Sequence, residues 1–212
     1  AEHVAKVVEE SGLFTDGFSM QAGAGGISLA ASAFIRERMK AAGIRGSFIS
    51  GGITGQSVEM LEEGLFESLL DVQSFDLEAV ASLASNRGHA EMSASFYANT
   101  ASKGCAVDML DVAVLGATQV DMDFNVNVNT ESDGVLLHGI GGHMDTAAGA
   151  AMTVIVTPLF RGRMPMIVDS VLTVTTPGQT VDVVVTERGV AVNPRRKDLL
   201  ENLRGKGIPL ME

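Results

Sequence analysis

Tryptophan is absent from this 212-residue sequence, and Tyr97 is its only tyrosine. Single-stranded nucleic acids stack their bases on aromatic side chains, so this scarcity argues against such a ligand. Basic residues are also few: 15 lysines and arginines face 26 acidic residues, which gives a net charge of −11. A nucleic-acid interface gains most of its affinity from basic groups facing phosphates. The composition therefore predicts no nucleic-acid partner.

Cysteine is nearly absent too, because Cys105 is the only one. A single cysteine forms no intrachain disulfide and no cysteine-based zinc site, which fits a reducing cytoplasm. Apolar runs are short: the longest, 147–160, is interrupted by threonine and proline, and a bilayer span needs about 20 apolar residues. The charged segment 1–10 does not resemble a signal peptide. We expect a soluble, cytoplasmic protein without a membrane segment.

Two common enzyme signatures are missing. The sequence contains neither Gly-x-Ser-x-Gly, the turn that carries the serine of many hydrolases, nor a Walker phosphate loop. His3, His89 and His138 show no spacing typical of metal ligands. Serine hydrolysis and nucleotide hydrolysis are therefore disfavoured, and we expect no bound metal.

Hydrophobic residues make up 46% of the chain and glycine contributes 24 residues, as in α/β enzymes with a large core. Strand and helix patterns alternate up to about residue 118, which predicts a doubly wound, mostly parallel sheet in one domain. The later part is richer in strands, which favours a mixed sheet. The predicted helices are 2–12, 27–42, 57–66, 77–85 and 195–203, and the predicted strands are 18–21, 44–50, 69–74, 111–115, 120–128, 153–158, 166–172 and 181–186.

Three glycine-rich segments follow or approach predicted strands: 23–26, 51–55 and 139–150. At the carboxyl ends of parallel strands, glycines allow backbone amides to approach an anion or an oxyanion. Tight turns that need a positive φ explain the same glycines without any ligand. The candidate residues in these segments are Gly23, Gly25, Gly26, Gly51, Gly52, Gly141, Gly142, His143 and Asp145.

Asparagines alternate with valines just before the third glycine segment. Asn125, Asn127 and Asn129 would share one face of a strand, because side chains in a strand alternate between faces. Their amides could donate hydrogen bonds to a carbonyl or carboxylate. An exposed polar strand face is the alternative.

Glu59 lies two residues after Ser57, a predicted helix cap. The first turn of a helix favours an ionised carboxylate, which could attack a thioester or simply complement the helix dipole. His143 could donate a hydrogen bond to developing negative charge, or titrate near neutrality.

Two basic clusters stand out in this acidic chain. Arg161 and Arg163 flank Gly162, and Arg195, Arg196 and Lys197 begin the last predicted helix. Arginine binds carboxylates and phosphates well, so either cluster could hold an anion. The alternative for residues 195–197 is that their charged side chains simply face solvent in a loop.

Several motifs together resemble the acyl-CoA transferase and acetyl-CoA hydrolase superfamily and, within it, the alpha chains of citrate lyase. They cover nearly the whole chain and read GAGGISLA, SFISGGITG, LLDVQSFD, SKGCAVDMLDV, FNVNVNTESDGVL, GGHMDTA, RGRMP and TERGVAVNPRR. The resemblance implies a CoA-transferase-like α/β fold. It also implies that residues 1–212 form the second, C-terminal domain of a longer two-domain subunit.

The resemblance further implies a transferase that moves an acyl-carrier thiol from acetyl-carrier protein, or from acetyl-CoA, to citrate through a mixed anhydride without a metal. The thiol would belong to a CoA-like, phosphopantetheine-type prosthetic arm on the acyl carrier (gamma) subunit. A citryl-thioester lyase (beta) subunit and further copies of this subunit would complete the complex. Carrier proteins are usually acidic, so docking would use one of the basic clusters.

Under this reading, amides of 23–26 and of Gly141, Gly142 and His143 hold the oxyanion or the thiol arm. Gly51, Gly52 and Asp145 also belong to the binding site for the arm. Asn125 and Asn127 orient the carbonyl, and Arg161 or Arg163 neutralises a citrate carboxylate. The assignment requires Gly25, Gly52 and Gly141 to share a cleft.

Two rival hypotheses stay open. In covalent CoA-transferases and hydrolases a glutamate of the pattern Glu-Met-x-x-x-Gly attacks the thioester, and residues 59–64 match that pattern. Glu59 would then be acylated, either in a transferase or in an acetyl-CoA hydrolase. A non-catalytic scaffold or ligand-sensing domain is the other alternative.

Overall fold

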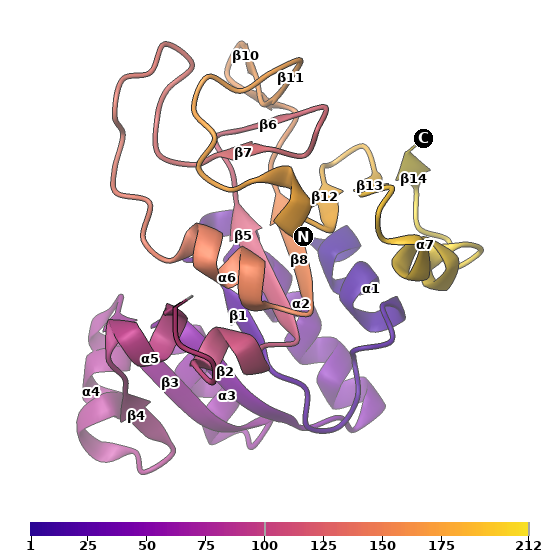
Figure 1. The fold of residues 1–212 in the computed structure, drawn as a ribbon. Coiled ribbons are helices and arrows are strands. Elements are labelled where there is room, and N and C mark those ends of the chain that lie inside the picture. The colour runs from indigo at the N-terminus through magenta and orange to yellow at the C-terminus, as the bar shows by residue number, and fades with distance from the viewer. Residues whose placement is uncertain (100, 212) are drawn as a thin grey trace.

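A nine-stranded sheet forms the centre of the protein in a computed structural model that describes residues 1–99 and 101–211 (Figure 1). The strands follow the order β14-β13-β12-β8-β5-β1-β2-β3-β4, and every neighbouring pair is parallel except β12 and β13. The predicted mixed, mostly parallel sheet is confirmed. The strands are β1 (Met20–Ala22), β2 (Gly46–Ile53), β3 (Phe66–Ser74), β4 (His89–Glu91), β5 (Val112–Gly116), β8 (Met152–Val156), β12 (Val183–Val185), β13 (Val190–Val192) and β14 (Leu210–Met211).

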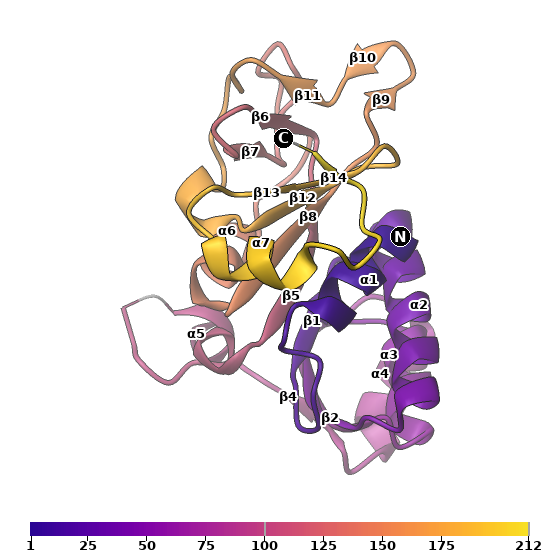
Figure 2. The ribbon, with the colours of Figure 1, turned by 90° about the vertical axis from the view of Figure 1, so that its right-hand side faces the viewer.

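Helices cover both faces of this sheet, as Figure 2 shows. One face carries α1 (Glu2–Glu10), α2 (Gly26–Ala42), α3 (Gly55–Glu62) and α4 (Leu77–Ser85), and α7 (Lys197–Leu203) packs beside α1. The other face carries α5 (Ala94–Ala98), the 3₁₀ helices η1 (Ala106–Met109) and η2 (Gly178–Thr180), and α6 (His143–Gly149). Central strands buried on both faces need continuous apolar sequence, and Val112, Ala113 and Val114 are fully buried.

The direction of winding reverses between β1 and β5. From β1 the chain moves outward through β2, β3 and β4, whereas from β5 it moves the other way through β8 and β12. In doubly wound sheets, ligands bind outside the carboxyl ends of the strands at such a switch point. The backbone amide of Gly23, which follows β1, donates to the carbonyl of Val114 in β5 at 2.9 Å. The first glycine segment therefore lies at the switch point.

A smaller layer rises from the carboxyl edge of the main sheet, where the carboxyl ends of its parallel strands lie (Figure 1). It consists of β6 (Gln119–Asp121), β7 (Val126–Asn127) and β11 (Ile167–Val168), with a hairpin of β9 (Phe160–Arg161) and β10 (Met164–Pro165). The excursion from β5 to β8 contributes β6, β7 and α6.

The predicted strand 120–128 is wrong, because the chain turns back after Asp121. The Asp121 carboxylate accepts the amides of Asp123 at 3.0 Å and Asn125 at 2.9 Å, and Phe124 adopts a positive φ of 65°. Only 126–127 pair as β7, so the three asparagines do not share a strand face. The predicted strand 166–172 is likewise reduced to 167–168.

The start of α3 also differs from the prediction. Thr54 is the residue before the first turn, α3 begins at Gly55, and Ser57 lies inside it. The Asp76 carboxylate accepts the amide of Gly55 at 2.7 Å and also caps α4 by accepting the amide of Ala79 at 2.8 Å. A carboxylate from the next helix thus stabilises this helix start, which no local pattern predicts.

Most other boundaries agree within about three residues. The predicted helix 77–85 is confirmed, and 27–42 is observed as α2. The helix α6, the short strand β4 and the hairpin partner β13 were not predicted. Among the described residues, no helix is both long enough and apolar enough to span a bilayer.

Candidate functional site

The start of α2 presents backbone amides at the switch point. The residue before its first turn is Gly25, which offers no side-chain cap, and the first turn holds no acidic residue. The leading amides of any helix lack acceptors within the helix, and in this 17-residue helix they add to the positive end of the dipole. Gly25 and Gly26 are exposed, and a Cβ built on either would meet no atom within 4 Å. An anion could bind here.

A cavity of about 380 Å³ opens beside this helix start. Its volume falls within the range of small-molecule sites, about 300–1,000 Å³. It lies between α2 and the carboxyl ends of β8 and β12, and its walls are mostly apolar with a few polar groups. The lining residues are Ala1, Gly26, Ile27, Ala30, Val156, Thr157, Pro158, Val185, Thr186 and Glu187.

His143 joins the third glycine segment to the switch point. Its Nε2 lies 2.9 Å from the carbonyl of Gly116, at the end of β5, and its Nδ1 lies 2.6 Å from the hydroxyl of Thr176. A carbonyl only accepts, so Nε2 carries the proton and Nδ1 accepts from Thr176. Burial lowers the pKa of His143 below its usual value, an effect partly opposed by the bond to Gly116. In this arrangement both ring nitrogens are engaged within the protein.

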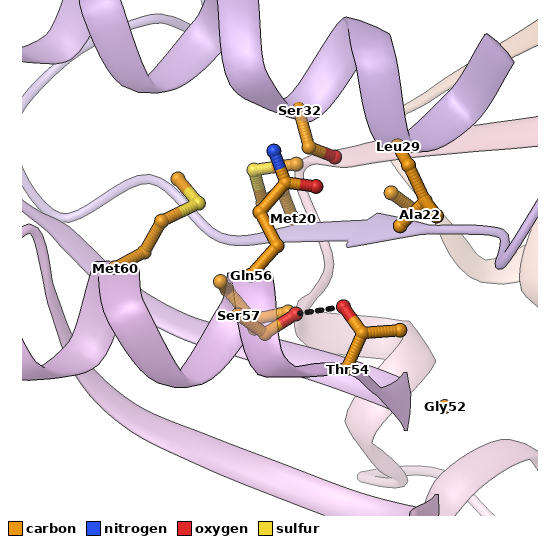
Figure 3. Close-up of a pocket in the computed structure, with 10 residues that line it drawn as sticks. Met20, Ala22, Leu29, Ser32, Gly52, Thr54, Gln56, Ser57 and Met60 are labelled. Atoms are coloured by element: carbon orange, nitrogen blue, oxygen red, sulfur yellow. Dashed lines mark hydrogen bonds between the residues drawn. The ribbon is translucent and has the colours of Figure 1, made fainter. Parts of the chain in front are cut away.

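The second glycine segment faces a much smaller space (Figure 3). Gly52 lines a cavity of about 10 Å³, enough for about one water molecule. In the close-up, Gln56 of α3 points toward Ser32 of α2 across this space. The amide of Gly55, which opens α3, is already bonded to Asp76. This space is too small for a thioester, and the roles predicted for Gly51 and Gly52 stay predictions.

The first and second glycine segments contribute to different cavities. Gly51 packs against the side chain of Gln21, and Gly142 packs against Tyr97, which is hydrogen-bonded to Gln21. Gly26, in contrast, lines the 380 Å³ cavity on the face covered by α2. Gly26 and Gly52 therefore line separate cavities, and the single cleft shared by Gly25, Gly52 and Gly141 stays a prediction.

Asn125 and Asn127 are engaged within the fold. The Asn125 side chain donates to Asp121 at 3.2 Å and accepts the amide of Gly178 at 2.9 Å. Asn127 is fully buried, donates to the Thr130 carbonyl at 3.0 Å and accepts the Thr130 amide at 3.1 Å. Both amides shape the loops of the small layer, and their substrate role stays a prediction.

Of the remaining charged candidates, the two arginines share one hairpin and Asp145 lies apart from them. Arg161 and Arg163 are exposed on the β9–β10 hairpin, whose turn uses the positive φ of Gly162, 64°. Asp145 lies in the first turn of α6 on the opposite face of the sheet from α2. None of the three lines the 380 Å³ cavity.

Glu59 lies in the second turn of α3, where it pairs with Arg36 of α2 at 2.5 Å. Arg36 also bonds Glu63, and hydrogen bonds from Arg36 and Lys40 lower the pKa of Glu63 to about 2. The Glu59 side chain is 55% exposed and lines a groove between α3 and α4, away from the start of α2. Its surroundings are those of a surface ion-pair network.

Three buried polar residues were missed by the sequence analysis. Gln21, Tyr97 and Thr146 form a hydrogen-bonded cluster between β1, α5 and α6. The available signals were weak: a glutamine next to the first glycine segment, and the only tyrosine in the chain. Among the described residues, no three His, Cys, Asp or Glu side chains are placed to hold a metal ion.

A doubly wound, mostly parallel sheet with helices on both faces and a helix start at its switch point defines a CoA-transferase-like α/β domain. Solved structures with this fold include RipA from Yersinia pestis, with a TM-score of 0.69 and 15% identity over 95% of this chain and 48% of that one. A malonate decarboxylase hetero-tetramer from Pseudomonas gives a TM-score of 0.66 at 15% identity, over 95% of this chain and 44% of that one.

The chain belongs to the family of citrate lyase alpha subunits, whose sequence profile matches residues 1–212. It is 54% identical to the citrate lyase alpha chain of Klebsiella pneumoniae and 53% identical to that of Escherichia coli K12, in each case over the whole of this chain. It covers 42% and 41% of those two proteins, so it spans about two fifths of their length. The resemblance seen in the sequence is confirmed.

A solved structure described as the alpha subunit of citrate lyase from Streptococcus mutans, in complex with citrate, has a TM-score of 0.97 at 49% identity. The match covers 99% of this chain and 41% of that one. The backbone described above is thus shared closely with that relative.

Proposed function

We propose that this chain forms part of the acyl-transfer site of a citrate lyase alpha subunit. The site would move an acyl-carrier thiol from an acetyl thioester to citrate. The observation that carries the proposal is the uncapped start of α2 at the switch point, beside a 380 Å³ cavity at the carboxyl ends of β8 and β12. Family membership supplies the chemistry, and citrate is the ligand named for the Streptococcus mutans relative.

The transfer consists of two carbonyl substitutions. A citrate carboxylate oxygen attacks the acetyl carbonyl, the new C–O bond forms, and the C–S bond breaks to release the thiolate. The thiolate then attacks the citryl carbonyl of the mixed anhydride, forming a new thioester and releasing acetate. Each step makes and breaks one acyl bond, so catalysis depends on positioning and on stabilising the oxyanion.

The start of α2 is suited to stabilising the oxyanion. Negative charge develops on the carbonyl oxygen during each attack, and the amides of Gly26 and Ile27 lie at the positive end of the helix dipole. The mostly apolar cavity beside them suits a thin prosthetic arm. The arm itself supplies the thiol, and this acyl exchange requires no metal.

The proposal extends to partners. The arm would belong to an acyl carrier subunit, and a separate lyase subunit would cleave the citryl thioester in a cytoplasmic complex containing further copies of this subunit. The chain spans about two fifths of its curated relatives. The active unit in any test is therefore the full-length subunit.

Citrate-dependent release of acetate by the full-length subunit, supplied with acetylated carrier protein, tests this function. Citrate labelled with ¹⁸O in its carboxylates should transfer ¹⁸O to acetate, because the anhydride oxygen leaves with the acetyl group. A full-length subunit that releases no acetate with citrate would contradict the proposal and favour a scaffold.

The covalent route through Glu59 is separated by a trapping experiment. After incubation with acetyl-CoA and hydroxylamine, mass spectrometry should find the peptide containing Glu59 unmodified, because Glu59 pairs with Arg36 away from the cavity. A hydroxamate at Glu59 would favour the covalent mechanism. The Glu59→Gln variant serves as the matched control, since it has no carboxylate to acylate.

A further inference from the structure

Tyr97 is buried between β1 and α6. The side-chain amide of Gln21 in β1 donates to the phenol oxygen of Tyr97 at 2.7 Å. The same oxygen lies 2.9 Å from the hydroxyl of Thr146 in α6, and Thr146 is fully buried. Because its oxygen accepts from Gln21, the phenol can donate its own proton to Thr146. One hydroxyl therefore bridges a central strand and a helix on its face.

The tyrosine ring also sets how closely α6 approaches. A Cβ added to Gly142 would lie 2.5 Å from a ring carbon of Tyr97, closer than real Cβ contacts. On the other side, a Cβ at Gly51 would lie 2.8 Å from the side-chain carbonyl carbon of Gln21. Gly51 has a φ of 100° and marks the bulge in β2. The backbones at Gly51 and Gly142 approach this cluster closely because glycine has no side chain.

This cluster links the turn 23–26 of the proposed site to the segment 141–143, whose role in holding the oxyanion or the thiol arm is the one predicted from the sequence. Gln21 is two residues before Gly23 in the chain, and Thr146 lies in the same short helix as His143. The bond from His143 to the Gly116 carbonyl is a second link between α6 and the strand ends. Together, the two links hold the segment 141–143 in a fixed position relative to the turn 23–26.

We propose that Tyr97 is a positioning residue for the transfer reaction, which makes this inference dependent on the proposed function. Its hydroxyl holds the segment 141–143 against the carboxyl ends of β1 and β5 without touching substrate. A purely stabilising role is the competing explanation. It predicts that activity falls only as far as the folded fraction falls, whereas positioning predicts a lower kcat in fully folded protein.

The test is Tyr97→Phe in the full-length subunit, which removes the hydroxyl and keeps the ring against Gly142. We expect kcat to fall about tenfold and the KM for citrate to change less than about twofold, because small misplacements of reacting groups cost rate rather than binding. Hydrogen exchange measured by mass spectrometry should become faster in peptides covering 139–149 and stay unchanged in α7.

Two further variants separate positioning from stability. Thr146→Ser keeps a hydroxyl facing Tyr97 and should retain most of kcat, whereas Thr146→Val should resemble Tyr97→Phe. Thr153→Val is the matched control, because it deletes a fully buried hydroxyl that also bonds α6, through the Ala147 carbonyl at 3.1 Å, but does not contact Tyr97. It should lower the thermal midpoint without lowering kcat at temperatures where the protein is folded.

The outcomes are distinguishable. Equal losses of kcat in Tyr97→Phe and Thr153→Val, or unchanged kcat in Tyr97→Phe, would overturn the positioning role. If the parent subunit releases no acetate with citrate, the proposed function fails. The hydrogen-exchange measurement then decides alone whether the Tyr97 hydroxyl holds the segment 139–149. Unchanged exchange over 139–149 in Tyr97→Phe would show that the hydroxyl does not hold this segment.

Discussion

The carboxylate of Asp76 accepts the backbone amide of Gly55 at 2.7 Å and thereby closes the start of α3. At the start of α2, Gly25 provides no such group. The two helices follow adjacent parallel strands, α2 after a glycine turn and α3 directly after β2, which contains Gly51 and Gly52. A carboxylate of the protein occupies the start of α3, and the start of α2 is open beside a cavity. This difference identifies the first glycine segment, rather than the second, as the candidate anion site.

Replacing Asp76 with alanine should destabilise the fold, because α3 and α4 both lose an acceptor at their first turn. Loss of one such cap costs about 1 kcal/mol, so we expect about 1–3 kcal/mol for the two amides together. Urea denaturation of the parent and the variant measures the difference. Asp169→Asn, which neutralises an exposed carboxylate, should change the free energy of unfolding by less than about 0.5 kcal/mol.

Replacing Gly26 with proline should lower transfer activity while preserving α2. Proline is well tolerated at the first position of a helix, and Gly25 has the extended backbone that a following proline requires, with φ −68° and ψ 147°. The substitution removes one amide that we assign to the oxyanion, and such a loss costs about 10²–10³-fold in kcat. Gly26→Ala keeps the amide and should retain activity. Equal activities of the two variants would exclude this amide.

His143 should make stability depend on pH below about 6.5. Burial lowers its pKa in the folded state, so the unfolded chain takes up a proton first as pH falls. The free energy of unfolding should therefore decrease from pH 6.5 downward until the folded-state pKa is reached, and show no contribution from this group above that range. His143→Gln cannot titrate. The difference in the free energy of unfolding between the parent and His143→Gln, measured by urea denaturation at pH 5 to 8, should become smaller toward pH 5.

The two basic clusters should differ in carrier binding. Arg196 pairs with Asp182 at 2.8 Å and Asp198 at 2.7 Å, and it bonds the carbonyl of Ala151, just before β8. The cluster 195–197 therefore lies at the amino edge of the sheet, opposite the cavity. Arg161 and Arg163 follow the carboxyl end of β8.

We accordingly expect Arg161→Ser with Arg163→Ser to weaken binding of an acidic carrier protein, most strongly at low salt. Arg195→Ser with Lys197→Ser removes the same number of charges and should leave binding within about twofold. Calorimetric titrations at two salt concentrations check both pairs. The reverse result would place carrier docking at the amino edge.

The fold was predictable where local sequence and tertiary structure agree. Strands buried on both faces, such as 112–116, are continuously apolar, and α2 and α4 carry clear helical periodicity. The segment after Thr118 was less predictable, because its turns depend on contacts between distant residues. The Asp121 carboxylate, for example, also accepts the amide of Val171, 50 residues away.

The candidate site was predictable only in part. The glycines of 23–26 gave the location, because helix starts after parallel strands have a local signature. The sequence could not distinguish them from Gly51 and Gly52, since the difference is the carboxylate of Asp76 from another element. Gln21 and Thr146 are 125 residues apart, so their meeting at Tyr97 has no local signal.

The excursion between β5 and β8 has a consequence for how this fold can diversify. The two strands pair in direct register, from Val112 with Met152 to Gly116 with Val156, although the chain between them builds β6, β7 and α6. Because the sheet closes beneath this excursion, its length and loops can change without shifting the strands below. Replacing the segment between β5 and β8 with the corresponding segment of a distant relative should therefore change the loops above the strand ends. The main sheet should keep its structure.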